Sequence, residues 1–446
     1  MKKSLILIFA CLFAMHGFTI AQKQAWSLEE CIQYAIDHNI QIKQQTIQTK
    51  VQKNALDQAK LNLLPTITGQ ASHDYSFGRA LDQNTYTFYN QTVLQDYFYL
   101  GGRTDLFNGL QNLNSIQKNK YELLAGEQDL QRIRDNVALS VGLAYLQILL
   151  NKELVTANEN QVNITLQQIE KTKKLVDAGS VARGNLLQIE AQAAQEELSL
   201  ITMKNQLETS YLNLTQLLEL ESPAGFEIVV PDINVEQNSV VTGNIDEIYN
   251  LAAQSRPEIK SSELKLTASE YALKIAKGAR SPSISLSHTF GTRYSYIKDI
   301  PGFQSFGDQL KNNKNYGLGV SMSIPVLNGW QVNKNISNSK LSVENSQYTL
   351  EGSKKTLYKD IQQAYTDAVA ALKKYNASAK AVSSSEESFR YTEQKFNVGM
   401  ITPVDYNASK TQLLNAQSDM SQAKYEFIFK TKVLDFYKGL PLTLNK

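Results

Sequence analysis

The mature chain contains three histidines and one cysteine as candidate metal ligands or nucleophiles. His38, His73 and His288 lie far apart in the sequence, without the close spacing of a metal-binding motif. Cys31 has no evident partner to activate it and occupies a position where a helix takes a small apolar residue. A glycine-rich phosphate loop is also missing from the sequence. We therefore expect no catalytic centre, no metal and no cofactor, and we do not expect an enzyme.

Two short polar residues lie where helices are predicted to begin. Asn185 and Asp405 each follow a glycine, Gly179 or Gly399, by six residues. Such side chains commonly cap the free backbone N–H groups of a helix start. The residues themselves leave open whether capping is their role or whether they act in function.

The charge balance of the chain excludes one class of partner. Of its 446 residues, 45 are Lys or Arg and 43 are Asp or Glu. Lys2 and Lys3, the apolar stretch that follows and the small residues ending at Ala21 predict a secretory signal peptide over residues 1–21. Its removal leaves 43 basic and 43 acidic residues, so the mature chain is formally neutral. We expect no nucleic acid partner.

The second cysteine, Cys11, belongs to this signal peptide. Cys31 is then the only thiol of an exported chain, so no intrachain disulfide can form and stability must come from packing. Cys11 could instead accept a lipid, although apolar residues continue past it to Phe13. Beyond the signal peptide, no run of 18 or more apolar residues predicts a transmembrane helix.

An internal duplication organises the rest of the sequence. Two segments that begin at Ser27 and Asn244 stay in register without a gap until Pro65 and Pro282, an offset of 217 residues. Blocks further along the chain match at an offset of 220, which indicates three inserted residues after Pro282. We expect a first structural repeat at 22–221, an inter-repeat connector at 222–243 and a second structural repeat at 244–446.

Each repeat begins with a helical period and changes to a strand period at its proline. From Ser283 to Tyr296 apolar and polar residues alternate strictly, and alternation recurs from Tyr316 to Val326. Phe98, Leu100 and Leu106 of the first repeat are predicted to take the face that Leu318, Val320 and Val326 take in the second. Segments 79–92 and 297–314 are predicted to be the connecting loops. Strands are expected at about 66–78, 94–106, 283–296 and 316–326.

These strands have the length and pattern of membrane-spanning strands. At about 3.3 Å per residue, a 14-residue strand tilted by about 45° spans roughly 30 Å, the thickness of the hydrocarbon core of a bilayer. The alternative is a half-buried strand of a soluble sandwich, but two strands per repeat are few for a sandwich between long helices.

A seven-residue repeat follows the strands in both copies and predicts long supercoiled helices. They are expected at about 108–178 and 328–398, and each would be about 100 Å long at 1.5 Å per residue. Return helices are expected at about 185–220 and 405–438, after turns at glycines that can take the left-handed conformation. A filament-like coiled coil explains the heptads but not the strands. The main seam carries Val141, Ile148, Val155, Val162, Ile169 and Val176, then Ile361, Ala368, Tyr375, Val382, Phe389 and Phe396.

Several short motifs occur once in each repeat and in the same order. They are Asn39-Ile40-Gln41 and Arg256-Pro257-Glu258 after acidic helix starts, Pro65 and Pro282, Leu106-Phe107-Asn108-Gly109 and Val326-Leu327-Asn328-Gly329, and the turns at Gly179 and Gly399. In this order, the duplicated motifs make the chain resemble the TolC-type outer membrane efflux proteins, over essentially the whole mature chain.

The resemblance implies an α+β membrane protein with duplicated coiled-coil hairpins and four β-strands per chain. Three copies would share a twelve-stranded transmembrane barrel in the outer membrane, with a helical tunnel across the periplasm. The implied partners are two further copies in a homotrimer, outer membrane lipid, a periplasmic adaptor (membrane fusion) protein and an inner-membrane pump. The implied function is passive conduction of substrate in a tripartite efflux or type I export system. The alternative from another class is a periplasmic coiled-coil structural protein or adhesin without a pore.

The resemblance also assigns roles to particular residues. The periplasmic tip would be constricted at Asp405 and Asn185, although Ala408 stands where the best-known member of the family has a second acidic residue. The polar strand face would line a water-filled lumen and the apolar face would meet lipid. The adaptor-contacting turns would be Gly179, Ser180, Val181, Ala182 and Arg183, with Gly399, Met400, Ile401, Thr402 and Pro403. The lumen residues would be Ser283, Ser285, Ser287, Arg293 and Ser321.

Overall fold

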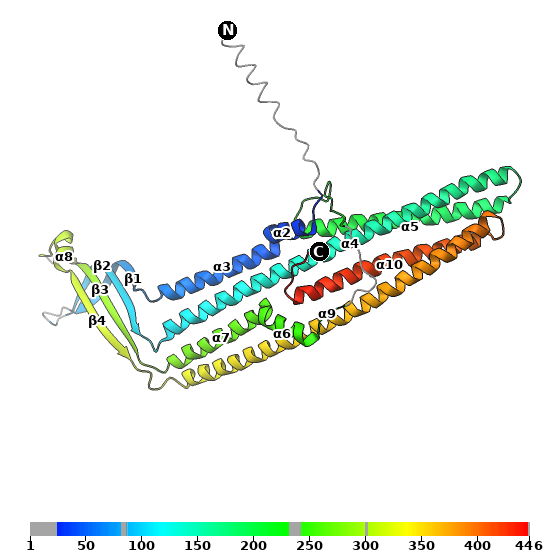
Figure 1. Cartoon of the computed structure of the whole chain (residues 1–446). Coiled ribbons are helices and arrows are strands. Elements are labelled where there is room, and N and C mark those ends of the chain that lie inside the picture. The colour runs from blue at the N-terminus through cyan, green and yellow to red at the C-terminus, as the bar shows by residue number, and fades with distance from the viewer. Residues whose placement is uncertain are drawn as a thin grey trace, which may run out of the picture. The chain divides into compact units, whose positions relative to one another are not determined.

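The structure, a computed structural model, describes residues 25–81, 86, 88–231, 241, 243–298 and 302–444 (Figure 1). The predicted signal peptide and the middle of the predicted connector, 232–240, lie outside these residues. The first repeat contains α2 (Leu28–His38), α3 (Ile40–Leu61), β1 (Thr66–Leu81), β2 (Phe88–Phe107), α4 (Gln111–Asp177) and α5 (Arg183–Leu217). The second contains α6 (Ile245–Ser255), α7 (Pro257–Gly278), β3 (Ser283–Ile297), α8 (Phe306–Asn312), β4 (Asn315–Ser323), α9 (Gln331–Asn397) and α10 (Pro403–Tyr437).

The helix bounds repeat with the two offsets found in the sequence. α6 and α7 begin 217 residues after α2 and α3, and α9 and α10 begin 220 residues after α4 and α5. The chain also divides into two compact units, but each unit combines segments of both repeats. The first unit comprises residues 1–45, 130–256 and 354–446, and the second comprises 46–129 and 257–353.

The short helices begin where sequence chemistry places a cap. The Ser27 hydroxyl accepts the Glu30 N–H, and the Glu30 carboxylate accepts the Ser27 N–H at 2.7 Å. Asn244, the residue of the second repeat that corresponds to Ser27, caps α6. These bonds satisfy N–H groups that a helix start leaves without partners, and the acidic first turns oppose the helix dipole favourably.

The four strands form one antiparallel sheet of order β1-β2-β3-β4 in the second unit (Figure 1). β1 pairs with β2 from Thr66 opposite Arg103 to Leu81 opposite Phe88, so most of the predicted loop 79–92 is strand. A bulge at Leu106 shifts the register, and Phe107 rather than Leu106 pairs with Ile284. Phe107 therefore continues the apolar alternation opposite Ile284, and the bulged Leu106 has no pairing partner on β3.

β4 is shorter than predicted and ends at Ser323 rather than at about 326. Pro325 explains the difference because proline has no backbone N–H to donate to a strand partner. Val326 is therefore outside the strand, and its predicted position on the strand face is wrong.

The predicted loop 297–314 contains the short helix α8, which covers β3 beyond the end of β4. The last pair of the two strands is Gly291 with Asn315. Beyond this pair, at Ser295 of β3, the Gln309 side-chain amide accepts the Ser295 N–H and donates to the Ser295 carbonyl, both at 3.0 Å. A side chain thus satisfies backbone groups that would otherwise lie on an open strand edge.

Strand leads into long helix through a duplicated Asn-Gly turn. Gly109 and Leu110 have φ of +67° and +62°, and Gly329 and Trp330 have +60° and +67°. A Cβ on Gly109 would collide with the Gly278 carbonyl oxygen, so this turn requires glycine. The turns delay α4 and α9 to Gln111 and Gln331, three residues after the predicted starts.

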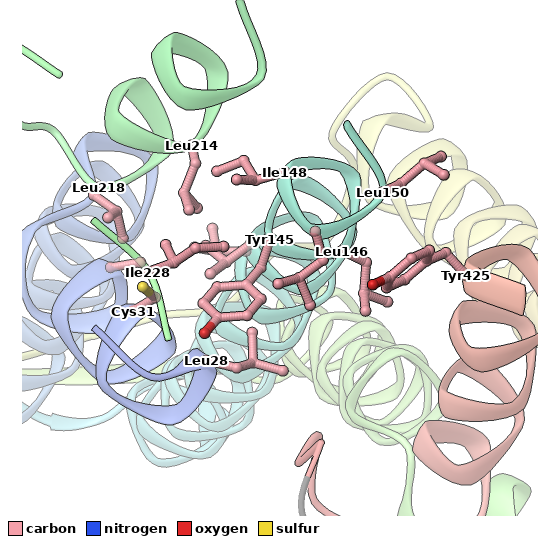
Figure 2. Close-up of a cluster of buried hydrophobic side chains, with 14 of the residues drawn as sticks. Leu28, Cys31, Tyr145, Leu146, Ile148, Leu150, Leu214, Leu218, Ile228 and Tyr425 are labelled. Atoms are coloured by element: carbon pink, nitrogen blue, oxygen red, sulfur yellow. The ribbon is translucent and has the colours of Figure 1, made fainter. Parts of the chain in front are cut away.

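A hydrophobic core in the first unit surrounds one face of α4 (Figure 2). α2, α5 and α10 contribute side chains to the same cluster. The Tyr145 hydroxyl lies 2.6 Å from the Val229 carbonyl and 3.1 Å from the Trp26 carbonyl. It holds the start of the described chain against the connector, where Trp26 and Ile228 form a parallel bridge. The buried members include Leu28, Cys31, Ala35, Val141, Tyr145, Ile148, Leu149, Leu214, Leu218, Tyr425 and Ile428.

One helix of the described chain, α4, is long and apolar enough by composition to cross a membrane. It also supplies Val141, Tyr145, Ile148 and Leu149 to the core, so packing accounts for its hydropathy.

The environment of Cys31 predicts an unreactive thiol. Burial, with smaller contributions from the carboxylates of Glu30 and Glu29, raises the pKa of Cys31 to about 12. At pH 8 very little thiolate is present, so modification by a thiol reagent should be at least about 100-fold slower in the folded than in the denatured protein. A Cys31→Ser, Ser180→Cys variant, with its thiol on an exposed turn, is the matched control. Equally fast labelling of Cys31 and the control would contradict the buried packing.

Candidate functional site

The two helix hairpins of the first unit end in the same turn structure. Gly179 and Gly399 both have φ of +76°. The Gly179 N–H donates to the Val176 carbonyl, and the Ser180 N–H donates to the Leu175 carbonyl, both at 2.9 Å. Gly399 and Met400 repeat this pair of bonds at 3.0 and 2.9 Å. This pattern ends a helix within one residue and requires a left-handed conformation, which glycine supplies.

Asp405 is held at the start of α10 by the residue that caps the helix. The Thr402 hydroxyl accepts the Asp405 N–H at 3.2 Å and donates to the Asp405 carboxylate at 2.8 Å. Pro403 occupies the first helical turn, where its missing N–H has no cost. Thr402 is thus the cap of α10, whereas the Asp405 carboxylate accepts a hydrogen bond from the cap hydroxyl and remains exposed.

Asn185 does not cap α5. The cap residue is Ala182, which has no side-chain hydrogen bond, and Asn185 lies two residues inside the helix with its N–H donating to the Ala182 carbonyl. The two predicted constriction residues therefore occupy similar chain positions but different hydrogen-bonding environments.

A hydrogen bond joins the two hairpins near their tips. The Lys171 ammonium of α4 donates to the Asn397 side chain of α9 at 2.9 Å. Within the second hairpin, Tyr406 packs against the rings of Phe396 and Phe389, with centroids 4.5 and 5.3 Å away. The second hairpin is thus stabilised by an aromatic cluster close to its turn.

The predicted lumen residues lie on one face of the sheet in the second unit. Ser285 and Ser321 hydroxyls lie 2.9 Å apart across β3 and β4, and Ser287 donates to the Gly319 carbonyl. Ser283 and Arg293 occupy the same alternation of β3. The opposite face carries Leu318 and Val320, which are 78% and 69% exposed.

The apolar face contains one polar pair that sequence reasoning missed. His73 Nδ1 lies 2.5 Å from an oxygen of Asp96 across β1 and β2. Asp96 is buried, and by the alternation of β2 it lies on the same face of the sheet as Phe98 and Leu100. His73 therefore has a carboxylate partner. No group of three or more potential metal ligands occurs among the described residues.

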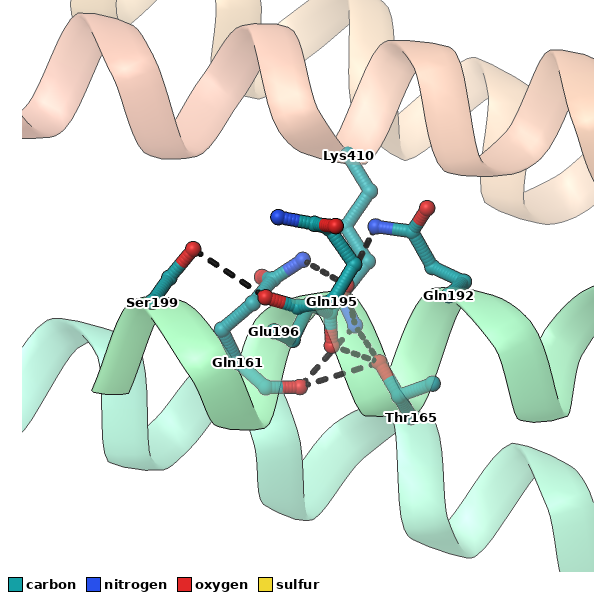
Figure 3. Close-up of polar contacts among 7 residues, drawn as sticks. All are labelled: Gln161, Thr165, Gln192, Gln195, Glu196, Ser199 and Lys410. Carbon is teal, nitrogen blue, oxygen red and sulfur yellow. Dashed lines mark hydrogen bonds and ion pairs between the residues drawn. The ribbon is translucent and has the colours of Figure 1, made fainter. Parts of the chain in front are cut away.

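A buried polar network links the two hairpins, about two to four turns from the hairpin ends of the helices (Figure 3). Lys410 of α10 is 3% exposed and donates to the Thr165 hydroxyl at 2.5 Å and to the Gln161 carbonyl at 3.0 Å, both on α4. Its ammonium lies 3.8 Å from the Glu196 carboxylate of α5. The Thr165 hydroxyl donates to this carboxylate while accepting from Lys410.

The second carboxylate oxygen of Glu196, Oε1, also has hydrogen-bond partners. The Gln161 amide donates to the carboxylate at 2.9 Å and the Gln192 amide donates at 3.0 Å. Burial lowers the pKa of Lys410, and the Glu196 carboxylate opposes that effect. A buried charge remains stable only with such compensation, because an unpaired one carries a desolvation penalty of several kcal/mol.

The sequence contained part of the signal for this network. Thr165 lies in a heptad position beside the main seam, where the residues change from apolar at Val137 and Ala144 to polar from Asn151 onward. Lys410 and Glu196 lie on return helices without any local feature that marks them as buried. Only the packing of α10 against α4 and α5 brings their charges together.

The family model described as outer membrane efflux protein matches residues 31–219 and 248–429. The chain belongs to the outer membrane efflux protein family. The predicted fold class of duplicated helical hairpins with four strands per chain is confirmed, and so is the predicted outer membrane location with a large periplasmic portion. This is a family of channel-forming proteins and not of enzymes.

Individual relatives are distant in sequence. Outer membrane protein TolC of Escherichia coli is 22% identical over 439 residues, which cover 96% of this chain and 84% of TolC. Outer membrane efflux protein BepC of Brucella suis is 21% identical over 239 residues, 53% of this chain, and the matched part spans about half (48%) of BepC. The crystal structure of VceC from Vibrio cholerae has a TM-score of 0.75 at 17% identity, covering 92% of this chain and 96% of VceC.

Removing Lys410 should destabilise the packing of the two hairpins. Lys410→Ala leaves Glu196 buried without its cation, so we expect a loss of about 3–5 kcal/mol in the free energy of unfolding. Lys374→Ala, which breaks an exposed 2.8 Å pair with Glu426, should cost less than about 1 kcal/mol. The measurement is urea unfolding followed by helical circular dichroism.

A double variant distinguishes the charge from the volume of the lysine. Lys410→Met with Glu196→Gln removes both charges and should recover most of the lost stability. If Lys410→Ala were as mild as Lys374→Ala, the buried network would not contribute as described.

Proposed function

We propose that this chain is the outer membrane channel of a tripartite efflux or type I export system. In this role it passively conducts substrate that an inner-membrane pump and a periplasmic adaptor deliver to it. The single observation that carries the proposal is the sheet with one serine- and glycine-rich face and one apolar face, joined directly to helices of 67 residues. In a membrane-spanning barrel, polar and apolar residues alternate along each strand because one face of the sheet lines the aqueous lumen and the other contacts lipid.

The open edges of the sheet support a homotrimer. Within the described residues, the outer edges of β1 and β4 have no strand partner. A membrane gives unpaired backbone groups no water to bond, so a spanning sheet must close on itself. Three copies of four strands give a closed barrel of twelve, within the strand numbers of known outer membrane barrels.

The tip turns are the proposed contacts of the adaptor. Residues 179–183 and 399–403 are mostly exposed. They connect the helices of each hairpin at the ends of α4 and α9 that lie far in the sequence from the strands. Asp405 and Asn185 are the proposed constriction. Asp405 copies around a common axis would attract cations and repel one another.

The decisive test is electrical, since a channel conducts and a coiled-coil structural protein does not. Purified protein from the outer membrane fraction should form ion-conducting pores in a planar bilayer. A water-soluble protein without conductance would contradict the proposal and favour the pore-free alternative.

The charge of Asp405 can be tested separately from the helix cap that Thr402 provides. Asp405→Asn removes the charge and keeps a short polar side chain beside Thr402, so we expect weaker cation preference and weaker block by multivalent cations. Thr402→Ala removes the cap hydroxyl and keeps the charge, so its ion selectivity should remain that of the parent. Unchanged selectivity and block in Asp405→Asn would exclude the constriction role.

The two faces of β4 should tolerate charge differently. Leu318→Lys places an ammonium on the lipid side, at a cost of about 2–4 kcal/mol near the bilayer midplane, and should prevent assembly in the outer membrane. Ser321→Lys places the same group on the proposed lumen side and should assemble. Membrane fractionation measures both, and equal tolerance of the two lysines would reverse or remove the face assignment.

A further inference from the structure

The serine- and glycine-rich face of the sheet, the lumen side of the proposed barrel, also carries two tyrosines. Tyr97 and Tyr99 of β2 are 40% and 42% exposed. Tyr97 pairs with Arg293 of β3, and Tyr99 pairs with Gly291, so all four residues share this face. A water-filled lumen by itself requires no aromatic side chain, so the two rings call for a separate explanation.

Glycines allow the Tyr99 ring to lie along the sheet. A Cβ added to Gly101 would collide with this ring and its hydroxyl, so the ring occupies the space in which another residue would have its side chain. A Cβ added to Gly291 would lie 3.6 Å from an edge carbon of the same ring. A ring that lies along a sheet turns one face to the solvent, and this face is the part of an aromatic side chain that stacks on a planar group.

A hollow of about 400 Å³ lies beside the two tyrosines. Most of its lining residues belong to the same alternation, and Gly291 and Gly317 among them add no side chain that would fill it. Asn315, at the start of β4, lines the hollow and pairs with Gly291. The hollow therefore has the size of a small-molecule site, with aromatic faces on β2 and an amide on β4.

Arg293 gives the hollow a positive charge. Its side chain is exposed and lines the hollow. Arg103 of the same face lies 3.2 Å from the Asp105 carboxylate, whereas no carboxylate of the described residues lies within 4.0 Å of Arg293. Asp74, the other acidic residue on this face of the described strands, lies on β1, two strands from Arg293. A guanidinium without an acidic partner favours an anionic ligand, which it can hold through two parallel N–H bonds.

We propose that this hollow is a binding site for planar aromatic anions, which are aromatic rings that carry a carboxylate, sulfonate or phosphate group. The ring of the ligand stacks on Tyr99 and Tyr97, and its acidic group is bound by Arg293. Asn315 offers its amide to the polar edge of the ligand. This inference rests on the proposed function, which places this face in the lumen, and adds a site at which one class of substrate is retained within the barrel.

Two other ligand classes satisfy only half of the site. Aromatic faces also attract cations, but a cation in the hollow would lie beside the Arg293 guanidinium and be repelled by it. An aliphatic anion would pair with Arg293 and leave both tyrosine faces without a stacking partner. The ligand therefore needs both a planar ring and a negative charge.

Equilibrium binding to the purified protein in neutral detergent tests this inference. The probe is naphthalene sulfonate. Cyclohexane sulfonate keeps its charge and lacks the aromatic ring, and naphthylmethylammonium keeps the ring and reverses the charge. We expect calorimetry, corrected for titration into detergent alone, to show one naphthalene sulfonate per chain. Its affinity should be at least about tenfold higher than that of the aromatic cation and about threefold or more above that of the aliphatic anion.

Substitutions separate the ring from the charge. Tyr99→Leu removes a stacking face and should weaken naphthalene sulfonate binding about threefold or more, whereas Tyr99→Phe should bind like the parent. Arg293→Gln should weaken it about tenfold or more and remove the preference over the aromatic cation. Arg103→Gln removes a guanidinium of the same face outside the hollow and should leave binding unchanged. If Tyr99→Leu fails to assemble, Tyr97→Leu removes the other ring and replaces it.

The outcomes distinguish this inference from the proposed function. Equal affinity for naphthalene sulfonate and cyclohexane sulfonate, or binding that Arg293→Gln leaves unchanged, would overturn the site. A protein that conducts in bilayers but does not bind the probe would also overturn it and leave the channel role standing. A protein that binds the probe with these preferences but does not conduct would leave the site standing and contradict the channel role.

Discussion

The packing along α4 and α9 is the constraint on which the rest of the helical structure depends. A helix of 67 residues is about 100 Å long and cannot bury its apolar seam against itself. α4 therefore collects α2, α5, the connector segment at Ile228 and α10 around Val141, Tyr145 and Ile148. The Tyr145 hydroxyl is buried with two backbone carbonyls as partners, so this apolar cluster also determines where the connector lies.

Duplication gives each long helix the same set of surfaces, but one chain can use them only once. The α10 face covers α4 and becomes core, while the equivalent α5 face is exposed. The buried Lys410 network marks the side that is completed within the chain, because a charge so buried must find all its partners during folding of that chain. Leu187, Leu198 and Leu212 of α5, by contrast, remain more than half exposed.

Sequence reasoning succeeded where one local pattern defined an element. It failed at the end of a strand and at an open strand edge, where residues from other elements decide the structure. Period-two alternation identified β3, and the glycines identified both hairpin turns. It overextended β4, because Pro325 ends pairing before the alternation stops, and it missed α8, whose Gln309 takes the place of a strand partner. It also could not decide between capping and function for Asp405, since the Thr402 hydroxyl that holds the carboxylate belongs to the turn geometry.

By itself, the sequence determined the duplication, the order of helices and strands and the alternating faces. These properties follow from periodicity and residue type, which act between neighbours in the chain. Only the tertiary structure decided that Lys410 meets Thr165 and Glu196, and that α5 and α10 differ in exposure. Those outcomes depend on contacts between residues up to 268 positions apart, and no local pattern encodes which of two equivalent helix faces a distant segment will cover.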